Sequence, residues 1–221
     1  MPQFTLVNED MKRRRLTTVS RKRNKKDGIA EKETKKNMKE EIIIAGFGGQ
    51  GVLSMGKILA YSAIMQNLEV TWMPSYGPEM RGGTANVCVI ISDRKISSPI
   101  ITKYDTAIIL NQQSLDKFED KVKPGGLLVY DPSGITRAPA RKDITVCSID
   151  AIEVAAEAGN PKVYNMAVLG AYLQMKSIVK MENVVKGLEK SIPARYADMI
   201  QKNREAIEKG KEKVKIISSV L

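Results

Sequence analysis

The sequence predicts an α/β fold: a mostly parallel sheet flanked by helices, followed by a helical C-terminal part. Short aliphatic and β-branched runs, typical of buried parallel strands, recur between residues 42 and 149. The first run leads through a glycine-rich turn into a helical pattern, and helical patterns dominate after residue 150. This order of elements is Rossmann-like.

The first 38 residues differ from the rest in charge. The 221-residue chain has a formal net charge of +11, of which residues 1–38 carry +7 from 12 Lys and Arg and 5 Asp and Glu. Large apolar residues are few there, which predicts a basic, disordered leader followed by a single α/β domain over residues 39–221. The leader lacks the apolar stretch of a secretory signal. It could be a nucleic-acid-binding arm, but we consider nucleic acid an unlikely partner and favour a dispensable extension.

The composition excludes several classes of site. The chain has no His and two Cys, Cys88 and Cys147, so it cannot form a Ser-His-Asp or Cys-His catalytic site, a zinc site or a four-thiolate cluster. Both Cys lie in apolar strand patterns and are expected to be unreactive core thiols. No run is apolar enough to span a membrane, so no membrane partner and a cytoplasmic location are expected.

The first predicted strand, Ile42–Ala45, leads directly into a glycine-rich loop. Apolar residues at helical spacing follow from Val52 to Ala63. The glycines permit a tight turn and a close approach of the backbone to a ligand. The loop consists of Gly46, Phe47, Gly48, Gly49, Gln50 and Gly51.

The glycine spacing matches that of a nicotinamide dinucleotide site, but the supporting context is missing. Such a site needs an acidic residue at the end of the second strand to hold the ribose. Here the predicted second strand, Val70–Trp72, is followed by Met73 and Pro74. A P-loop is excluded because no Gly-Lys-Ser/Thr follows the glycines. The glycine spacing alone is therefore weak evidence for a dinucleotide.

A second loop combines bending residues with one acid, one base and one aromatic. It precedes the predicted strand Ala85–Ser92, and loops at the carboxyl end of parallel strands commonly carry function. Alternatively, Glu79 and Arg81 simply pair with each other at a surface turn. The loop consists of Tyr76, Gly77, Pro78, Glu79, Met80, Arg81, Gly82 and Gly83, and Thr84 follows it.

The remaining pattern predicts three more strands and five more helices. A helix capped by Asn111 or Ser114 runs to about Val122, and Asp131 begins a structural turn. Further strands are Thr106–Leu110, Leu127–Tyr130 and Ile144–Ile149. Two further helices are Ala151–Ala158, with Asp150 as its cap, and Glu182–Leu188. Between them lies a longer helix whose apolar face contains Val168, Tyr172, Met175 and Val179. The last helix begins at Pro193 and has Tyr196, Ile200 and Ile207 on one face. Ala167, Gly170 and Ala171 permit a close helix approach, and Lys213–Leu221 has no clear pattern.

Both loops resemble signatures of the gamma subunit of 2-oxoacid:ferredoxin oxidoreductases. Three further segments follow in the order typical of that family, and the resemblance covers about residues 40–209, which leaves the leader unexplained. The segments are Ile96–Pro99, Asp131–Gly134 and Asn165–Gly170.

The resemblance implies a multisubunit enzyme that oxidatively decarboxylates a 2-oxoacid with coenzyme A, giving acyl-CoA, carbon dioxide and reduced ferredoxin. Thiamine diphosphate would lie between alpha and beta subunits, and iron–sulfur clusters in the beta and delta subunits. The gamma subunit would be non-catalytic and bind none of these cofactors alone. It would act as a scaffold and lid, with 2-oxoglutarate slightly favoured over pyruvate or a branched-chain substrate.

The two loops would then form one surface that docks the catalytic subunits and covers the coenzyme A and thiamine site. Arg81 would pair with a phosphate or a partner carboxylate, Tyr76 would anchor the interface, and Glu79 would fix Arg81. Two alternatives remain: a free-standing nucleotide-binding oxidoreductase, and a basic protein that binds nucleic acid through its leader.

Overall fold

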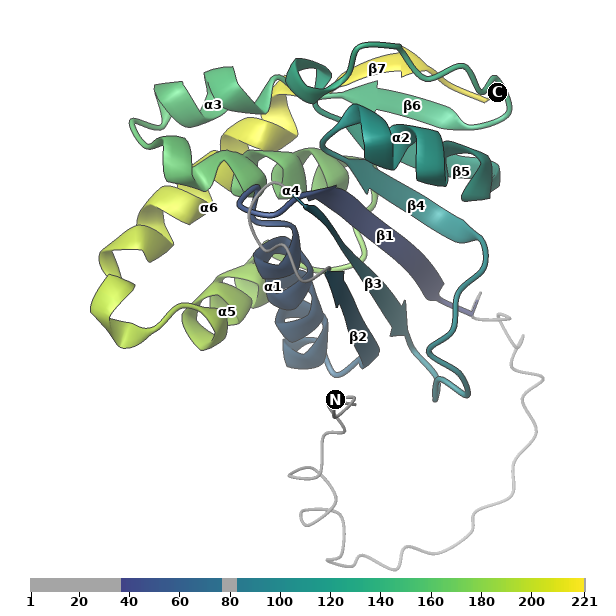
Figure 1. Cartoon of the computed structure of the whole chain (residues 1–221). Coiled ribbons are helices and arrows are strands. Elements are labelled where there is room, and N and C mark those ends of the chain that lie inside the picture. Colours follow the sequence, from purple (N-terminus) through teal and green to yellow (C-terminus); the bar gives the residue numbers. More distant parts are fainter. Residues whose placement is uncertain (1–36, 77–82, 221) are drawn as a thin grey trace, which may run out of the picture.

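The computed structural model describes residues 37–76 and 83–220. Seven strands in these ranges form one sheet in the order β2-β3-β1-β4-β5-β6-β7 (Figure 1). The strands are β1 (Lys39–Phe47), β2 (Glu69–Tyr76), β3 (Thr84–Ser92), β4 (Tyr104–Ile109), β5 (Val122–Tyr130), β6 (Thr145–Ser148) and β7 (Lys215–Ser218). The predicted leader lies almost entirely in residues 1–36, outside the described residues.

The sheet is mostly parallel, as the sequence predicted. Strands β1, β4, β5 and β6 pair in parallel, whereas β3 is antiparallel to both β1 and β2, and β7 is antiparallel to β6. Because two antiparallel steps restore the direction, β2 points the same way as β1. The carboxyl ends of β1, β2, β4, β5 and β6 therefore lie at one edge of the sheet.

The helices cover the two faces of the sheet unequally. Residues of α1, α3, α4, α5 and α6 join the larger apolar cluster on one face, and α2 packs with the smaller cluster on the other. Helices α3 to α6 gather at one side of the molecule (Figure 1). The helices are α1 (Val52–Met65), α2 (Gln112–Phe118), α3 (Ala151–Glu157), α4 (Tyr164–Met175), α5 (Met181–Ser191) and α6 (Asp198–Lys213). None of the helices in the described ranges is long and apolar enough to cross a membrane.

The centre of the sheet explains the continuous apolar run of the first strand. Ile42 and Ile44 belong to the larger cluster, while Ile43 and Ala45 belong to the smaller one, and all four are 0% exposed. Because successive side chains of a strand point to opposite faces, a strand that is buried on both faces must be apolar at every position. The prediction of a buried central strand is confirmed.

The backbones of helices α4 and α6 lie close together where the two helices cross. A methyl group added at Gly170 would lie 2.9 Å from the carbonyl carbon of Ile207, and one added at Gly210 would lie 2.8 Å from that of Ala167. Each helix thus presents a glycine to the backbone of the other. The predicted close approach at Ala167, Gly170 and Ala171 is confirmed, and Gly210 is its counterpart on α6.

Two predicted caps and one predicted turn are also confirmed. The Asn111 side chain accepts a hydrogen bond from the Ser114 N–H at 2.8 Å, and Asp150 accepts one from the Glu153 N–H at 3.4 Å. Asp131 accepts one from the Ser133 N–H at 2.9 Å, at the start of a short 3₁₀ turn (Pro132–Gly134). These side chains fix the chain where it leaves β4, β5 and β6.

The predicted second strand was too short. Strand β2 continues past Trp72, through Met73 and Pro74, to Tyr76. Proline removes one donor from a ladder, but among the described strands β2 lies at the edge of the sheet and pairs with β3 alone. The proline therefore does not end the strand.

Other boundaries also differ from the prediction. The helix after Asn111 ends at Phe118, not Val122, because a 3₁₀ turn (Glu119–Lys121) leads directly into β5. Helix α4 ends at Met175, since Lys176 is extended, so Val179 lies outside it. Tyr196 lies in a separate 3₁₀ turn (Ala194–Tyr196) and is 49% exposed, so it shares no helix face with Ile200 and Ile207. The unassigned C-terminal segment contains β7.

Candidate functional site

The first loop joins β1 to α1 at the carboxyl edge of the sheet. Gly49 and Gly51 have φ angles of 101° and 74°, a backbone region that residues with a Cβ adopt only under strain. Gly46 is required for a different reason: a methyl group there would lie 2.6 Å from the side-chain oxygen of Gln50 and 2.9 Å from Leu110 Cβ. The glycines therefore serve both conformation and close packing.

Gln50 holds the first loop to the end of β4. Its side-chain oxygen accepts a hydrogen bond from the Phe47 N–H at 2.6 Å, and its side-chain nitrogen donates to the Leu110 carbonyl at 3.2 Å. The amide thus spans the loop and ties it to a strand 60 residues away. The sequence predicted Gln50 as a residue that faces a ligand or partner. The structure shows that its amide is occupied within the chain.

A second amide reaches the loop from α4. The side-chain nitrogen of Asn165 donates to the Gly51 carbonyl at 3.2 Å, and the Met55 N–H donates to the same carbonyl at 2.9 Å. A methyl group at Gly51 would lie 2.7 Å from Asn165 Cγ. A glycine at 51 therefore suits both the left-handed backbone and the neighbouring amide.

The second loop meets the first at its C-terminal end. The Gly48 N–H donates to the Gly83 carbonyl at 2.9 Å. Tyr76 ends β2, opposite Ala85 of β3. The other predicted residues of this loop, Gly77, Pro78, Glu79, Met80, Arg81 and Gly82, lie outside the described residues. The described ends of both loops thus lie at the same edge of the sheet.

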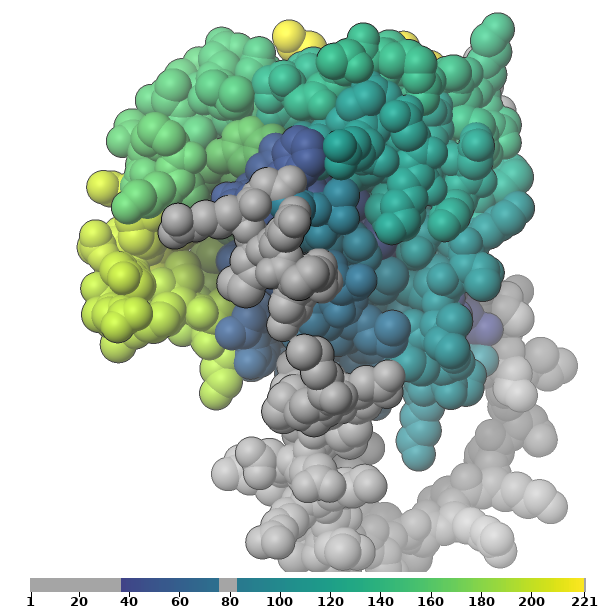
Figure 2. Space-filling view, in the orientation of Figure 1, coloured from purple at the N-terminus to yellow at the C-terminus, as the bar shows by residue number. Residues whose placement is uncertain are grey.

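A cleft of about 550 Å³ opens beside the first loop. One wall is apolar and comes from α3, where Ile152 is 57% exposed, and the opposite wall is the glycine loop itself. In the space-filling view, the surface of the first described residues, coloured purple and dark blue, meets the green surface of the later part of the chain (Figure 2). The cleft is lined by Gly49, Gln50, Gly51, Ser54, Ser133, Ile152, Ala155, Ala156, Pro161, Lys162, Tyr164 and Asn165.

The lining of the cleft favours an anionic or neutral polar ligand. Among the described residues that line it, Lys162 is the one cation, and there is no carboxylate. Helix α1 begins at the cleft with no side-chain cap and no acidic residue in its first turn. The free N–H groups of such a helix end attract negative charge.

Tyr164 and Ser133 line the cleft next to a buried carboxylate, Asp131. Asp131 is 0% exposed, and its second carboxylate oxygen makes no hydrogen bond to the described residues. Burial raises the pKa of the Tyr164 phenol, and the nearby Asp131 carboxylate raises this pKa further. Tyr164 therefore stays protonated near neutral pH and supplies a hydroxyl, not a base.

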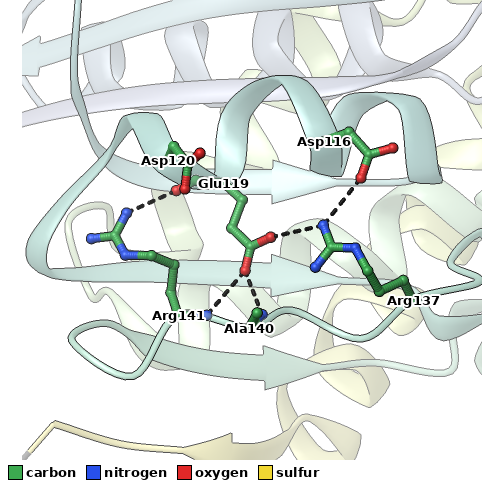
Figure 3. A pocket seen from close by; sticks show the side chains of 6 residues that line it. All are labelled: Asp116, Glu119, Asp120, Arg137, Ala140 and Arg141. Atoms are coloured by element: carbon green, nitrogen blue, oxygen red, sulfur yellow. Dashed lines mark hydrogen bonds and ion pairs between the residues drawn. The ribbon is translucent and has the colours of Figure 1, made fainter.

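A second hollow, lined by residues between α2 and β6, has a structural explanation. Glu119 accepts hydrogen bonds from the backbone N–H groups of Ala140 and Arg141 at 2.5 and 3.1 Å, and its other oxygen lies 3.2 Å from Arg137 (Figure 3). Arg137 also pairs with Asp116 at 3.1 Å. These charged groups already have partners within the chain. Their hydrogen bonds and ion pairs hold the β5–β6 connection in place.

Charged groups also gather at the opposite edge of the sheet, where β1 and β4 begin. Glu40 is 6% exposed and accepts a hydrogen bond from the Thr106 hydroxyl at 2.6 Å. Burial raises the pKa of Glu40, although Thr106 and Lys176, 3.6 Å away, oppose this rise. This edge lies at the far end of the strands from the loops, so Glu40 cannot serve the cleft.

The two thiols lie in the sheet. Cys147 is 0% exposed, and burial raises its pKa to about 11. Cys88 is half-buried, with its sulfur 3.8 Å from the Tyr104 hydroxyl, and burial raises its pKa. The prediction of a core thiol is confirmed for Cys147, while Cys88 is only partly buried. No group of three metal-ligating side chains occurs within residues 37–76 and 83–220.

The sequence did not predict the wall of the cleft that lies opposite the first loop. Ile152, Lys162 and Tyr164 had no assigned role. Ser133 and Asn165 lie in two segments that carried the family resemblance, Asp131–Gly134 and Asn165–Gly170, and this resemblance was the available signal for the wall. Lys162 follows the helix break at Pro161, where a polar residue ordinarily indicates only a solvated turn.

Comparison with known proteins places this arrangement in a family. Residues 41–213 match the family model described as pyruvate ferredoxin/flavodoxin oxidoreductase. The 2-oxoglutarate synthase subunit KorC of Methanocaldococcus jannaschii is 36% identical over 181 residues, which cover 80% of this chain and 95% of that relative. The ketoisovalerate oxidoreductase subunit VorA of Methanothermobacter thermautotrophicus is 40% identical over 132 residues. That match covers 60% of this chain but 27% of VorA, so the chain spans only about a quarter of that relative.

Solved structures agree with these relatives. The gamma subunit of a keto/oxoacid ferredoxin oxidoreductase from Geobacter sulfurreducens has a TM-score of 0.69 and 30% identity, covering 80% of this chain and 96% of that subunit. A chain of the 2-oxoglutarate:ferredoxin oxidoreductase from Magnetococcus marinus, with 2-oxoglutarate, coenzyme A and succinyl-CoA bound, has a TM-score of 0.70 and 27% identity. This match covers 79% of our chain and 30% of the Magnetococcus chain. The resemblance predicted from the two loops is confirmed: the chain belongs to the pyruvate ferredoxin/flavodoxin oxidoreductase family.

Proposed function

We propose that this chain is the non-catalytic gamma subunit of a thiamine-dependent 2-oxoacid:ferredoxin oxidoreductase. The complex would convert a 2-oxoacid and coenzyme A to acyl-CoA and carbon dioxide and pass the electrons to ferredoxin. The observation that carries the proposal is the meeting of the two loops at one edge of the sheet, through Gly48 and Gly83, beside a cleft whose lining has an apolar wall and one lysine. This surface would dock the catalytic subunits and cover the coenzyme A and thiamine site.

The cleft fits one part of coenzyme A in chemical terms. Lys162 and the uncapped start of α1 would hold an anionic group, and Ile152 and its neighbours would contact an apolar part of the ligand. Coenzyme A would supply the thiol that accepts the acyl group. Arg81 would pair with a phosphate or with a partner carboxylate, Glu79 would fix Arg81, and Tyr76 would anchor the interface.

The remaining cofactors are assigned to partner subunits. An iron–sulfur cluster commonly needs four thiolates, and this sequence has two Cys, on strands β3 and β6. Thiamine diphosphate and the clusters would therefore lie in the alpha, beta and delta subunits of a cytoplasmic complex. The chain would position them without taking part in proton or electron transfer.

2-Oxoglutarate is the substrate that we favour. The KorC subunit, named for 2-oxoglutarate synthase, matches this chain over 95% of its own length. The gamma subunit common to pyruvate and ketoisovalerate oxidoreductases of Thermococcus litoralis is 27% identical over 177 residues. Because substrate recognition would lie mainly on the other subunits, an assay must decide between these substrates.

The test is reconstitution. The chain is purified with the subunits that accompany it in its native cell, and the complex is assayed with 2-oxoglutarate, pyruvate and 2-oxoisovalerate, together with coenzyme A and a viologen dye. We expect coenzyme A-dependent dye reduction, fastest with 2-oxoglutarate, and none by the isolated chain. Tight NADPH binding by the isolated chain, or an active complex without this chain, would contradict the proposal.

Arg81→Ala tests the assigned loop separately. We expect a weaker apparent affinity for coenzyme A or a loss of assembly, because a guanidinium that pairs with a phosphate or carboxylate makes strong charged hydrogen bonds. Lys142→Ala, an exposed cation on the β5–β6 connection, is the matched control. An Arg81→Ala complex that assembles normally and keeps its coenzyme A affinity would refute the role of Arg81.

A further inference from the structure

The first loop is held by two amides that come from different parts of the chain. Gln50 spans the loop locally and reaches β4, whereas Asn165 comes from α4, 114 residues away in sequence. Both bond to backbone groups of the loop or of its neighbouring strand. The N–H groups of Gly49 and Gly51, two residues that line the cleft, donate to no acceptor within the described residues.

Asn165 connects the first loop to another wall of the cleft. It lines the cleft together with Lys162 and Tyr164, and it also bonds to the carbonyl of Gly51, the residue at the N-cap of α1. Gly51 has no side chain to cap α1, and its φ of 74° is a conformation that glycine adopts readily but does not prefer strongly over others. The Asn165 hydrogen bond therefore adds a second restraint, from a distant part of the chain, to a carbonyl that also accepts from the Met55 N–H.

We propose that Asn165 is a positioning residue: its side-chain amide holds the Gly51 carbonyl and so helps to fix the first loop, whose N–H groups would then face a ligand in the cleft. It acts through the loop backbone and not by contact with reacting atoms. The inference rests on the proposed function only in naming coenzyme A as that ligand. The restraint on the loop is a property of this chain alone.

Asn165→Asp is the sharpest substitution. It preserves shape and adds an acidic residue to the first turn of α4, where negative charge is favourable, but it replaces the donor with an acceptor facing the Gly51 carbonyl. Asn203→Asp is the matched control, because Asn203 donates to the Met199 carbonyl at 2.7 Å on α6 and does not line the cleft. Asn165→Gln keeps the donor and tests rescue.

The first measurement uses amide hydrogen exchange of the isolated full chain. We expect residues 46–54 to exchange about tenfold faster in Asn165→Asp, a change typical of losing one hydrogen bond, and to be unchanged in Asn203→Asp. Unchanged exchange of these residues in Asn165→Asp would overturn the inference, whatever the enzyme proves to be.

The second measurement uses the reconstituted complex. Asn165→Asp should raise the KM for coenzyme A about tenfold and leave the KM for the 2-oxoacid unchanged, with partial recovery in Asn165→Gln and no effect in Asn203→Asp. An equal rise in both KM values, or none, would overturn the role in ligand positioning. A wild-type complex that shows no coenzyme A-dependent activity would instead contradict the proposed function, and the exchange result would stand independently.

Discussion

A methyl group at Gly170 should destabilise the protein, although alanine is normally the better helix former. In an exposed helix, Gly→Ala is stabilising by about 0.5–1 kcal/mol. Here the methyl carbon would lie 2.9 Å from the carbonyl carbon of Ile207, and closer still to its oxygen. Both are backbone atoms of α6, so no side chain can turn away to make room.

The size of the effect follows from the distance that the helices must move. Close carbon–oxygen contacts between helices normally lie at about 3.3–3.6 Å. Restoring that separation at Gly170 requires α4 and α6 to part by roughly 1.2–1.5 Å, along a contact that includes the buried Ala206 and Ile207. Overpacking of this kind costs about 1–3 kcal/mol. After the gain in helix propensity, we expect a net loss of about 1–2 kcal/mol.

Thermal unfolding of the full chain measures this loss. We expect the Tm of Gly170→Ala to fall by about 2–8 °C, given a shift of about 2–4 °C per kcal/mol for a chain of this size. Gly210→Ala should behave alike, since its methyl group meets the Ala167 backbone. The double variant should lose less than the sum, because one separation of the helices relieves both overlaps.

A control at the exposed Lys202 of α6 separates packing from propensity. Lys202→Ala should be more stable than Lys202→Gly, which is the order that helix propensity alone predicts. If Gly170→Ala proved as stable as the wild type, or more stable, the close backbone contact between α4 and α6 would not constrain the fold. Strict additivity of Gly170→Ala and Gly210→Ala would likewise contradict a shared contact.

Three further substitutions or measurements test other parts of the structure. Burial raises the pKa of Glu40 above 4.5, so ionisation of this side chain opposes folding as the pH rises. Glu40→Gln should therefore raise the Tm at about pH 7, and the difference in Tm from the wild type should vanish near pH 4. Calorimetry at the two pH values measures this difference. Glu119→Ala leaves the N–H groups of Ala140 and Arg141 without an acceptor, so we expect a loss of about 2 kcal/mol and faster hydrogen exchange in residues 135–143. Cys147, with its pKa raised to about 11, should react with a thiol reagent only after unfolding. The absorbance of the reagent, followed at increasing denaturant concentration, measures this reaction.

The parts of the fold that could be predicted are those that depend on local sequence. The run Ile42–Ala45, the turn glycines and the spacing after Val52 each specify one element, and these elements were correct in kind and order. The end of β2 was predicted wrongly because proline normally ends a strand, and the pattern does not show that β2 is an edge strand. The direction of β3 depends on its pairing with β1, so local sequence could not predict it.

The candidate site likewise has one part that local sequence predicts and one part that it does not. The first loop was recognisable because its glycines are adjacent in sequence. The opposite wall was not, because Asn165 and Lys162 approach that loop only after the chain has passed through β3 to β6 and α3. Gln50 illustrates a further limit: its position in the motif suggested contact with a ligand, and local sequence did not show that its side chain also bonds to Phe47 and Leu110.

The chemistry of the cleft bears directly on the division of labour that we propose. General acid–base catalysis needs a group that changes protonation near the working pH. The lining of the cleft offers a tyrosine whose pKa is raised, two amides, two serine hydroxyls, a lysine and backbone N–H groups, while the Asp131 carboxylate beside Tyr164 is buried. These groups can bind and orient an anionic or polar ligand, but they do not form an acid–base pair among the described residues. A chain with such a site would contribute recognition to a reaction that its partners perform.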